Sequence, residues 1–335
     1  MIADPDAPAS LEDGLFGLGA DPGSTAVTVI PVPWQATTSF RRGTAQAPQA
    51  VLEASLQVDL HDRVTGDAYL KGIAMLPMPT QSWDARAEAD ALSVIAAGGV
   101  HTQQLQAAAE RVDAIGEQLR QWVFDQAQGV LARGGIPAVL GGDHSSPLGC
   151  IQAVGEQGPF GILHIDAHAD LRVAYEGFEG SHASIMNRVL DSVPTLERLV
   201  QVGIRDLGQA EAARIESERR IACFYDADLS WARASGATWV EQARRVVSLL
   251  PQRVYLSVDI DGLQPDLCPN TGTPVPGGLD WEQFTILLRV LQDSGRQVVG
   301  FDLCEVGAQQ WDAIVGARVL YRLACHAILS QPSGA

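Results

Sequence analysis

Three short segments of the sequence hold Asp and His at spacings suited to binding divalent metal ions. The first is Gly161–Asp170, an apolar run that ends in Asp166, His168 and Asp170. If the backbone stays extended, side chains two residues apart point to the same face, so these three would lie together. Carboxylate oxygens and imidazole nitrogens on one face suit a cation such as Mn²⁺, Fe²⁺, Ni²⁺ or Zn²⁺. Alone, the same spacing also fits a solvated strand end.

The other two segments also follow apolar runs. His144 lies after two glycines that allow a tight turn, and Asp259 and Asp261 again share one face of an extended chain. Together the segments supply His144, Asp166, His168, Asp170, Asp259 and Asp261. Four carboxylates packed together would repel one another strongly without cations. Two divalent ions would neutralise them and generate a nucleophilic hydroxide at neutral pH, so the sequence predicts a two-metal hydrolytic site.

Apolar runs and amphipathic segments alternate along the chain and would position this site. The predicted strands are Ala26–Val32, Gly72–Leu76, Pro137–Leu140, Phe160–Ile165, Leu199–Val202, Ile221–Tyr225, Val254–Val258 and Val298–Leu303. The predicted helices lie near 48–56, 102–133, 182–191, 208–219, 238–250, 280–293 and 311–328. Short apolar strands separated by helices predict an α/β fold, in which a mostly parallel sheet is covered on both faces. Ligand sites of such sheets lie beyond the carboxyl ends of the strands.

The overall composition predicts one globular domain and excludes some partners. No repeat or low-complexity linker divides the 335 residues, so we expect a single catalytic domain over 25–330 after a loose arm over 1–24. A net charge of −17 and a single lysine, Lys71, argue against nucleic acid and anionic membranes. The five cysteines form no C-x-x-C pair, and neither a signal peptide nor a membrane span of ~18 apolar residues is evident. We therefore expect a cytoplasmic protein.

The three motifs resemble the signatures of a known family. Gly141-Gly-Asp-His-Ser145, Asp166-Ala-His-Ala-Asp170 and Ser257-Val-Asp-Ile-Asp261 are similar to those of the ureohydrolases, which include arginase, agmatinase, guanidino-acid hydrolases and formimidoylglutamase. The resemblance implies the three-layer α/β/α arginase-like sandwich with an eight-stranded sheet. It also implies two Mn²⁺, although the ligand set would accept Ni²⁺, Co²⁺ or Fe²⁺. One ion would be held by His144, Asp166, Asp170 and Asp259, and the other by Asp166, His168, Asp259 and Asp261.

The resemblance further implies hydrolysis of a small-molecule guanidino substrate to urea and an amine, in a homo-oligomer that is commonly a trimer or hexamer. Glu305 matches the family's substrate-orienting glutamate, and His182 matches its proton-relay histidine. The alternatives are an ordinary strand-end carboxylate and a surface histidine beside the helix cap Ser181. His164 falls in the middle of a predicted strand, where we expect a core histidine.

The sequence leaves the choice of substrate open. The segment Thr271–Gly278 resembles agmatinases more than arginase, which favours agmatine hydrolysed to putrescine and urea. Arg172 could bind the carboxylate of a guanidino acid or of formimidoylglutamate, or it could pair with a neighbouring acid. Glu176 or Glu179 could bind the distal ammonium of agmatine. Free guanidine is a further alternative substrate, and a catalytically silent metal-binding paralogue is an alternative of another class.

Overall fold

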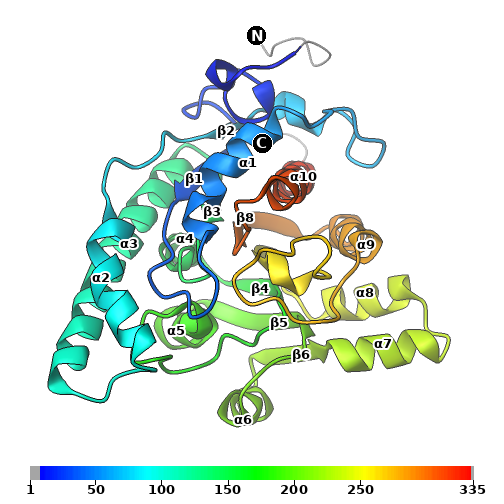
Figure 1. Ribbon diagram of the computed structural model, residues 1–335. Coiled ribbons are helices and arrows are strands. Elements are labelled where there is room, and N and C mark those ends of the chain that lie inside the picture. The colour runs from blue at the N-terminus through cyan, green and yellow to red at the C-terminus, as the bar shows by residue number, and fades with distance from the viewer. Residues whose placement is uncertain (1–7, 333–335) are drawn as a thin grey trace.

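The structure is a computed structural model that describes residues 8–332, and it is built on one eight-stranded parallel sheet (Figure 1). The strands are β1 Val27–Val32, β2 Ile73–Met75, β3 Ile136–Gly141, β4 Phe160–Ile165, β5 Leu196–Ile204, β6 Ile221–Tyr225, β7 Arg253–Asp259 and β8 Gln297–Cys304. Their order is β2-β1-β3-β8-β7-β4-β5-β6, and each neighbouring pair is parallel. The sequence predicted all eight of these strands, with ends that differ by at most three residues.

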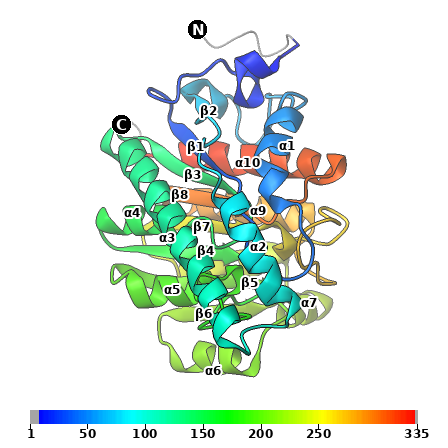
Figure 2. The same cartoon turned by 60° about the vertical axis from the view of Figure 1, so that its left-hand side comes forward.

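Helices cover both faces of the sheet, which gives the three layers that the sequence predicted. The described α-helices are α1 Ala47–Ser55, α2 Trp83–Ala96, α3 Gln103–Ala132, α4 Leu148–Glu156, α5 Ile185–Ser192, α6 Gln209–Ser217, α7 Asp226–Ala234, α8 Trp239–Ser248, α9 Trp281–Asp293 and α10 Gln310–Leu329. Alternate residues of a strand serve the two cores. In β3, Ala138 and Leu140 pack with α1, α8, α9 and α10, whereas Val139 packs with α2 to α5. Figure 2 shows α2 and α3 lying side by side over the face of the sheet to which Val139 points.

The sequence did not predict α2, α4 or α7. Seven of the nine α4 residues are buried, so the segment lacks the polar stripe that marks an amphipathic helix. Gly149 lets α4 approach α3 closely, because a Cβ there would lie 2.2 Å from the carbonyl oxygen of Arg120. The position of α4 therefore depends on packing rather than on a local sequence pattern.

The predicted loose arm is wrong for residues 11–18. Short 3₁₀ turns at Leu11–Asp13 and Leu15–Gly17 bring Leu15, Phe16 and Leu18 into the core, where each is buried. The Phe16 ring lies edge-on to Tyr321 of α10 at 5.1 Å. Burial of these apolar side chains offsets the ordering of the chain. Residues 1–7 lie outside the described part.

The sheet order brings the polar motifs together. β3, β8, β7 and β4 are consecutive neighbours, and their carboxyl ends lead to His144, Glu305, Asp259 and Asp166 respectively. Among residues 8–332, no helix is long and apolar enough to cross a membrane.

Candidate metal centre

Two groups of Asp and His side chains meet at the carboxyl ends of the central strands. His144 Nδ1 lies 3.0 Å from Asp166 Oδ2, 3.1 Å from Asp170 Oδ2 and 3.4 Å from Asp259 Oδ2. His168 Nδ1 lies 3.2 Å from Asp261 Oδ2 and 3.6 Å from Asp166 Oδ1. Asp166 therefore contributes one oxygen to each group. All six predicted ligands are brought together, in two groups that share a carboxylate.

The backbone that achieves this is not the extended one assumed from the sequence. β4 ends at Ile165, and Asp170 has a left-handed φ of 54°. Asp259 ends β7, and a 3₁₀ turn over Ile260–Gly262 follows, in which the Asp261 N–H donates to Asp259 Oδ1 at 2.8 Å. A left-handed residue other than glycine is strained, and such strain is concentrated at functional sites. The side chains converge because loops, rather than strands, aim them.

The electrostatics of the cluster show an excess of negative charge. Within residues 8–332, none of the four carboxylates forms an ion pair with Lys or Arg. Burial raises the pKa of Asp259 well above its usual value, and the nearby Asp261 and Asp166 raise it further. Burial opposes protonation of His168, but Asp261 and Asp166 raise its pKa to about 12. Protons thus compensate the charge when cations are absent, and divalent cations bound by these oxygens and nitrogens fit the same requirement.

The ring of His144 is oriented by Ser257 and Asp302, two residues outside the predicted ligand set. The Ser257 hydroxyl donates to Asp302 Oδ1 at 3.1 Å, so its oxygen is free to accept from His144 Nε2–H at 3.0 Å. In the neutral imidazole this leaves the Nδ1 lone pair directed at the carboxylates. Asp302 is a fully buried carboxylate within the apolar strand β8, and that irregularity was the available sequence signal.

His164 has partners on both ring nitrogens, as expected for a core histidine. Nε2 lies 2.8 Å from Asp166 Oδ2, and Nδ1 lies 3.0 Å from Gln201 Nε2. Gln201 also donates to the carbonyl of Ala169 at 2.8 Å. His164 therefore supports Asp166 from inside the sheet and ties it to β5.

Glu305 lies directly beside the metal-type cluster. Its Oε1 accepts the backbone N–H of His144 at 3.1 Å, while its Oε2 is buried without a hydrogen-bond partner. Burial raises its pKa well above the usual value, and the charges of Asp143 and Asp261 add to this effect. A Cβ on Gly272 would lie 3.0 Å from Oε2, so glycine at this position leaves room around the free oxygen.

A cavity of about 430 Å³ opens from the cluster toward solvent. His168, Asp170 and His182 lie along it, together with Ser39, Phe40, Arg41, Arg172, Tyr175, Ala183, Asp206, Glu211, Thr273, Pro274 and Val275. His182 Nδ1 is buried and has no hydrogen-bond partner, and burial lowers the pKa of this histidine. The Tyr175 ring stands edge-on to the His182 ring at 6.1 Å. The cavity thus presents a neutral imidazole next to the cluster.

Arg172 reaches this cavity, but it is already paired with an acid. Its Nε lies 3.6 Å from Glu211 Oε2, and its guanidinium stacks over Tyr175 at 4.7 Å. Glu211 in turn accepts the N–H groups of Leu171 at 3.0 Å and Gly208 at 2.7 Å. Of the two possibilities left open by the sequence, the structure shows the pairing with a neighbouring acid.

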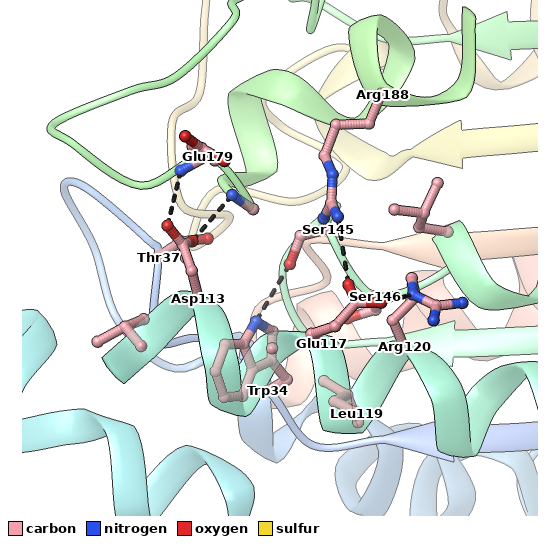
Figure 3. Close-up of a pocket in the computed structure, with 14 residues that line it drawn as sticks. Trp34, Thr37, Asp113, Glu117, Leu119, Arg120, Ser145, Ser146, Glu179 and Arg188 are labelled. Atoms are coloured by element: carbon pink, nitrogen blue, oxygen red, sulfur yellow. Dashed lines mark hydrogen bonds and ion pairs between the residues drawn. The ribbon is translucent and has the colours of Figure 1, made fainter. Parts of the chain in front are cut away.

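Glu176 and Glu179 do not line this cavity, so the structure gives no support to their suggested role with a distal ammonium. Glu179 lines a separate cavity of about 210 Å³, shown in Figure 3, where its N–H donates to Asp113. Arg188 there pairs with Glu117 at 3.3 Å. The charged groups of the second cavity thus largely compensate one another.

A chain of hydrogen bonds through Asp143 connects residues that line the two cavities. Ser145 donates to Asp143 Oδ1 at 2.5 Å. The same hydroxyl accepts Trp34 Nε1–H at 3.1 Å (Figure 3). Thr37 donates to Asp143 Oδ2 at 2.8 Å and accepts the N–H of His182 at 3.1 Å. Asp143 thereby anchors both the turn that carries His144 and the segment that carries His182.

This sheet and this Asp/His cluster define the class of metal-dependent hydrolases with the arginase fold. Residues 25–329 match the model of the arginase family, and the chain belongs to that family. It is 33% identical over 288 residues to an N(1)-aminopropylagmatine ureohydrolase of Synechocystis sp., covering 84% of this chain and 81% of the relative. It is 28% identical over 303 residues to a guanidinobutyrase of Pseudomonas aeruginosa, covering 88% and 84%.

The structural comparison agrees on the fold. The crystal structure of agmatine ureohydrolase of Thermoplasma volcanium superimposes with a TM-score of 0.70 at 24% identity, covering 92% of this chain and 91% of that chain. Members of the family hydrolyse guanidino C–N bonds at a binuclear metal centre, so this chain is a hydrolase of the ureohydrolase type that acts on a guanidino small molecule. If the protein were a catalytically silent paralogue, we would expect at least one of the six ligand positions to hold a residue that cannot bind a metal, but all six hold Asp or His.

Proposed function

We propose that this enzyme hydrolyses a guanidino amine, either agmatine or an N-substituted agmatine such as N(1)-aminopropylagmatine, and releases urea. The observation that carries the proposal is the charge pattern of the cavity. The charged residues of the cavity outside the metal-type cluster are Arg41, Arg172, Asp206 and Glu211. Within the described chain, only Asp206 has a side chain that makes no hydrogen bond or ion pair. Its backbone pairs with His168 as an isolated bridge, and this exposed residue lines the same cavity as His168. A free acid at this place suits the distal ammonium of a guanidino amine.

The two arginines of the cavity are engaged by protein groups. Arg41 donates to the carbonyl of Pro269 at 2.7 Å and lies over the Phe40 ring at 5.7 Å. Arg172 would have to leave Glu211 before it could bind a substrate carboxylate. A guanidino acid or formimidoylglutamate therefore remains the second candidate, supported by the guanidinobutyrase relative and by the presence of both cations.

We propose that the six Asp and His side chains bind two metal ions. His144, Asp166, Asp170 and Asp259 would hold one Mn²⁺, and Asp166, His168, Asp259 and Asp261 the other. When bound, the two ions supply the positive charge that activates water and stabilises the tetrahedral intermediate.

The protein's own groups then bind the substrate and move protons. The free Oε2 of Glu305 would accept hydrogen bonds from the guanidinium and hold it in one orientation. His182, neutral at pH 7, would first accept a proton at Nδ1 and then pass that proton to the departing amine, which returns the ring to its neutral form.

The test is urea release by the purified enzyme, reconstituted separately with Mn²⁺ and Ni²⁺. The panel is agmatine, N(1)-aminopropylagmatine, arginine, guanidinobutyrate and guanidine, with a separate ammonia or formamide readout for formimidoylglutamate. Turnover of the guanidino amines with the highest kcat/KM supports the proposal. Turnover of only the carboxylated compounds would overturn the substrate and transfer recognition to Arg172 and Arg41. A homo-oligomer and a cytoplasmic location stay predictions.

A further inference from the structure

Arg205 follows β5 and forms an unusual set of contacts. Its guanidinium donates six hydrogen bonds, all to backbone carbonyls: Nε to Val275 at 3.3 Å and Pro276 at 3.2 Å, Nη1 to Gly203 at 3.0 Å, and Nη2 to Asp261 at 2.6 Å, Val275 at 2.9 Å and Leu263 at 3.2 Å. No described carboxylate lies within ion-pair distance of it. A charged side chain that is half-buried and bonded only to carbonyls holds backbone segments together.

The contacts join three segments that are far apart in the sequence. Gly203 is the penultimate residue of β5, Asp261 is a predicted metal ligand in the turn after β7, and Val275 belongs to the loop that forms one wall of the substrate cavity. The wall and the ligand also meet directly, because Thr273 Oγ1 donates to Asp261 Oδ2 at 3.4 Å. One guanidinium therefore spans the sheet, the ligand turn and the cavity wall.

The loop that forms the cavity wall is held in place mainly by Arg205. Within the described chain, residues 272–278 make no hydrogen bonds except those with Arg205 and that of Thr273. Gly278 has a φ of 96°, and a Cβ there would lie 2.8 Å from Arg205 Nη2. Glycine at this position thus permits the close approach on which the contacts depend.

We infer that Arg205 is a positioning residue that fixes the cavity wall at Thr273–Val275 against the metal ligand Asp261. It acts on two events, substrate binding along the wall and retention of the ion held by His168 and Asp261. The inference rests on the family reaction and not on which guanidino compound is the substrate. Lysine cannot replace it, because a single ammonium cannot reach three segments that the planar five-donor guanidinium bridges.

The experiment compares Arg205→Lys and Arg205→Met with the matched control Arg198→Lys. Arg198 lies on β5, the strand that precedes Arg205, and its Nη1 donates to the Arg219 carbonyl at 2.6 Å, away from the cavity. For Arg205→Lys we expect KM to rise about tenfold while kcat changes less than about threefold, because the substrate wall moves but the reacting groups remain. Calorimetric titration of the metal-free protein with Mn²⁺ should show one of two sites weakened about tenfold. The control should match the wild type in both.

Arg205→Met, which keeps the apolar stem but has no donor, should show the same changes enlarged. If it fails to fold, Arg205→Lys alone decides. Unchanged KM and two unchanged Mn²⁺ affinities in Arg205→Lys would overturn the inference. So would equal weakening of both ions with a lowered thermal midpoint, which indicates a general structural role. If no panel compound is hydrolysed by the wild type, the Mn²⁺ titration still decides, so failure of the proposed substrate and failure of this inference are separate results.

Discussion

The backbone N–H of His144 donates to Oε1 of Glu305 at 3.1 Å. One hydrogen bond therefore joins a predicted metal ligand to the side chain that we propose binds the guanidinium of the substrate. Glu305 adopts a left-handed φ of 60° to make this contact. Such a conformation costs on the order of 1–3 kcal/mol and persists only where the surroundings enforce it. The strained residue leaves Oε2 buried and without a partner, which is the arrangement that an incoming guanidinium requires.

Glu305→Gln should retain both metal ions and lose substrate binding. The amide keeps the oxygen that accepts from His144, but it replaces the free carboxylate oxygen with a donor that repels a guanidinium. We expect kcat/KM to fall by about 10²-fold or more, the loss of a charge-assisted hydrogen bond in a buried site. Metal content by mass spectrometry and steady-state kinetics provide the measurement, with the exposed Glu282→Gln on α9 as control. Near-normal kinetics would remove Glu305 from the substrate site.

Asp259→Ala should abolish metal binding and turnover. Asp259 is within 3.4 Å of His144 and beside Asp261, so its loss removes a carboxylate from the shared centre of the cluster. Elemental analysis should find no bound metal ion, and Mn²⁺ should no longer raise the thermal midpoint of unfolding as it is expected to do for the wild type. As a control, Asp266→Ala, at an exposed position in the loop that follows β7, should behave as the wild type. An active Asp259→Ala enzyme would contradict the metal assignment.

His182→Gln should lower kcat with little effect on metal content. Burial lowers the pKa of His182, so the imidazole is neutral at pH 7 and its protonation limits activity only below the ordinary histidine range. The variant should lose about 10²–10⁴-fold in kcat. In the wild type, an acid limb of kcat below pH 6.5 that disappears in the variant would identify this group. A variant with the wild-type kcat and pH profile would exclude His182 from proton transfer.

Asp206→Asn should alter substrate preference rather than chemistry. Removing the unpaired carboxylate should raise KM for agmatine by about two- to fivefold, as expected for an ion pair with an exposed carboxylate, and should leave KM for guanidinobutyrate unaffected or lowered. The exposed Glu197→Gln on β5 serves as the control. A KM for agmatine equal to that of the wild type would show that the distal ammonium binds elsewhere.

His326 predicts an acid-sensitive stability that is independent of the metals. It is buried in α10 with Nδ1 2.6 Å from Gln292 Oε1, and burial lowers its pKa to about 4. The unfolded chain, with a histidine pKa near 6.5, binds the proton more tightly, so stability falls as pH drops from about 6.5 toward 4.

At pH 5 the loss attributable to His326 is about 2 kcal/mol. His326→Gln should therefore lose less stability than the wild type between pH 7 and pH 5. Urea unfolding of metal-free protein at both values measures this difference. Equal pH dependence in the two proteins would show that His326 is not the group responsible.

Local pattern predicted the sheet, and it predicted that the six Asp and His residues would lie together, for a definite reason. A buried parallel strand is a continuous apolar run, and the carboxyl ends of neighbouring strands meet at one edge, so Asp166 and Asp259 could be placed together without coordinates. The assumed extended backbone at Asp170 was wrong, yet the residue types at the strand ends were sufficient to place the site.

Other features depend on contacts between distant parts of the chain. The pairing of Arg172 with Glu211, the burial of Phe16 against Tyr321 and the bridging of three segments by Arg205 each join residues that no local period relates. A charged or aromatic side chain has the same sequence signature whether it faces water, a partner or a substrate. Only the packed fold, which removes water from some of these groups and supplies partners to others, decides which acid at the cavity remains free to bind a cation.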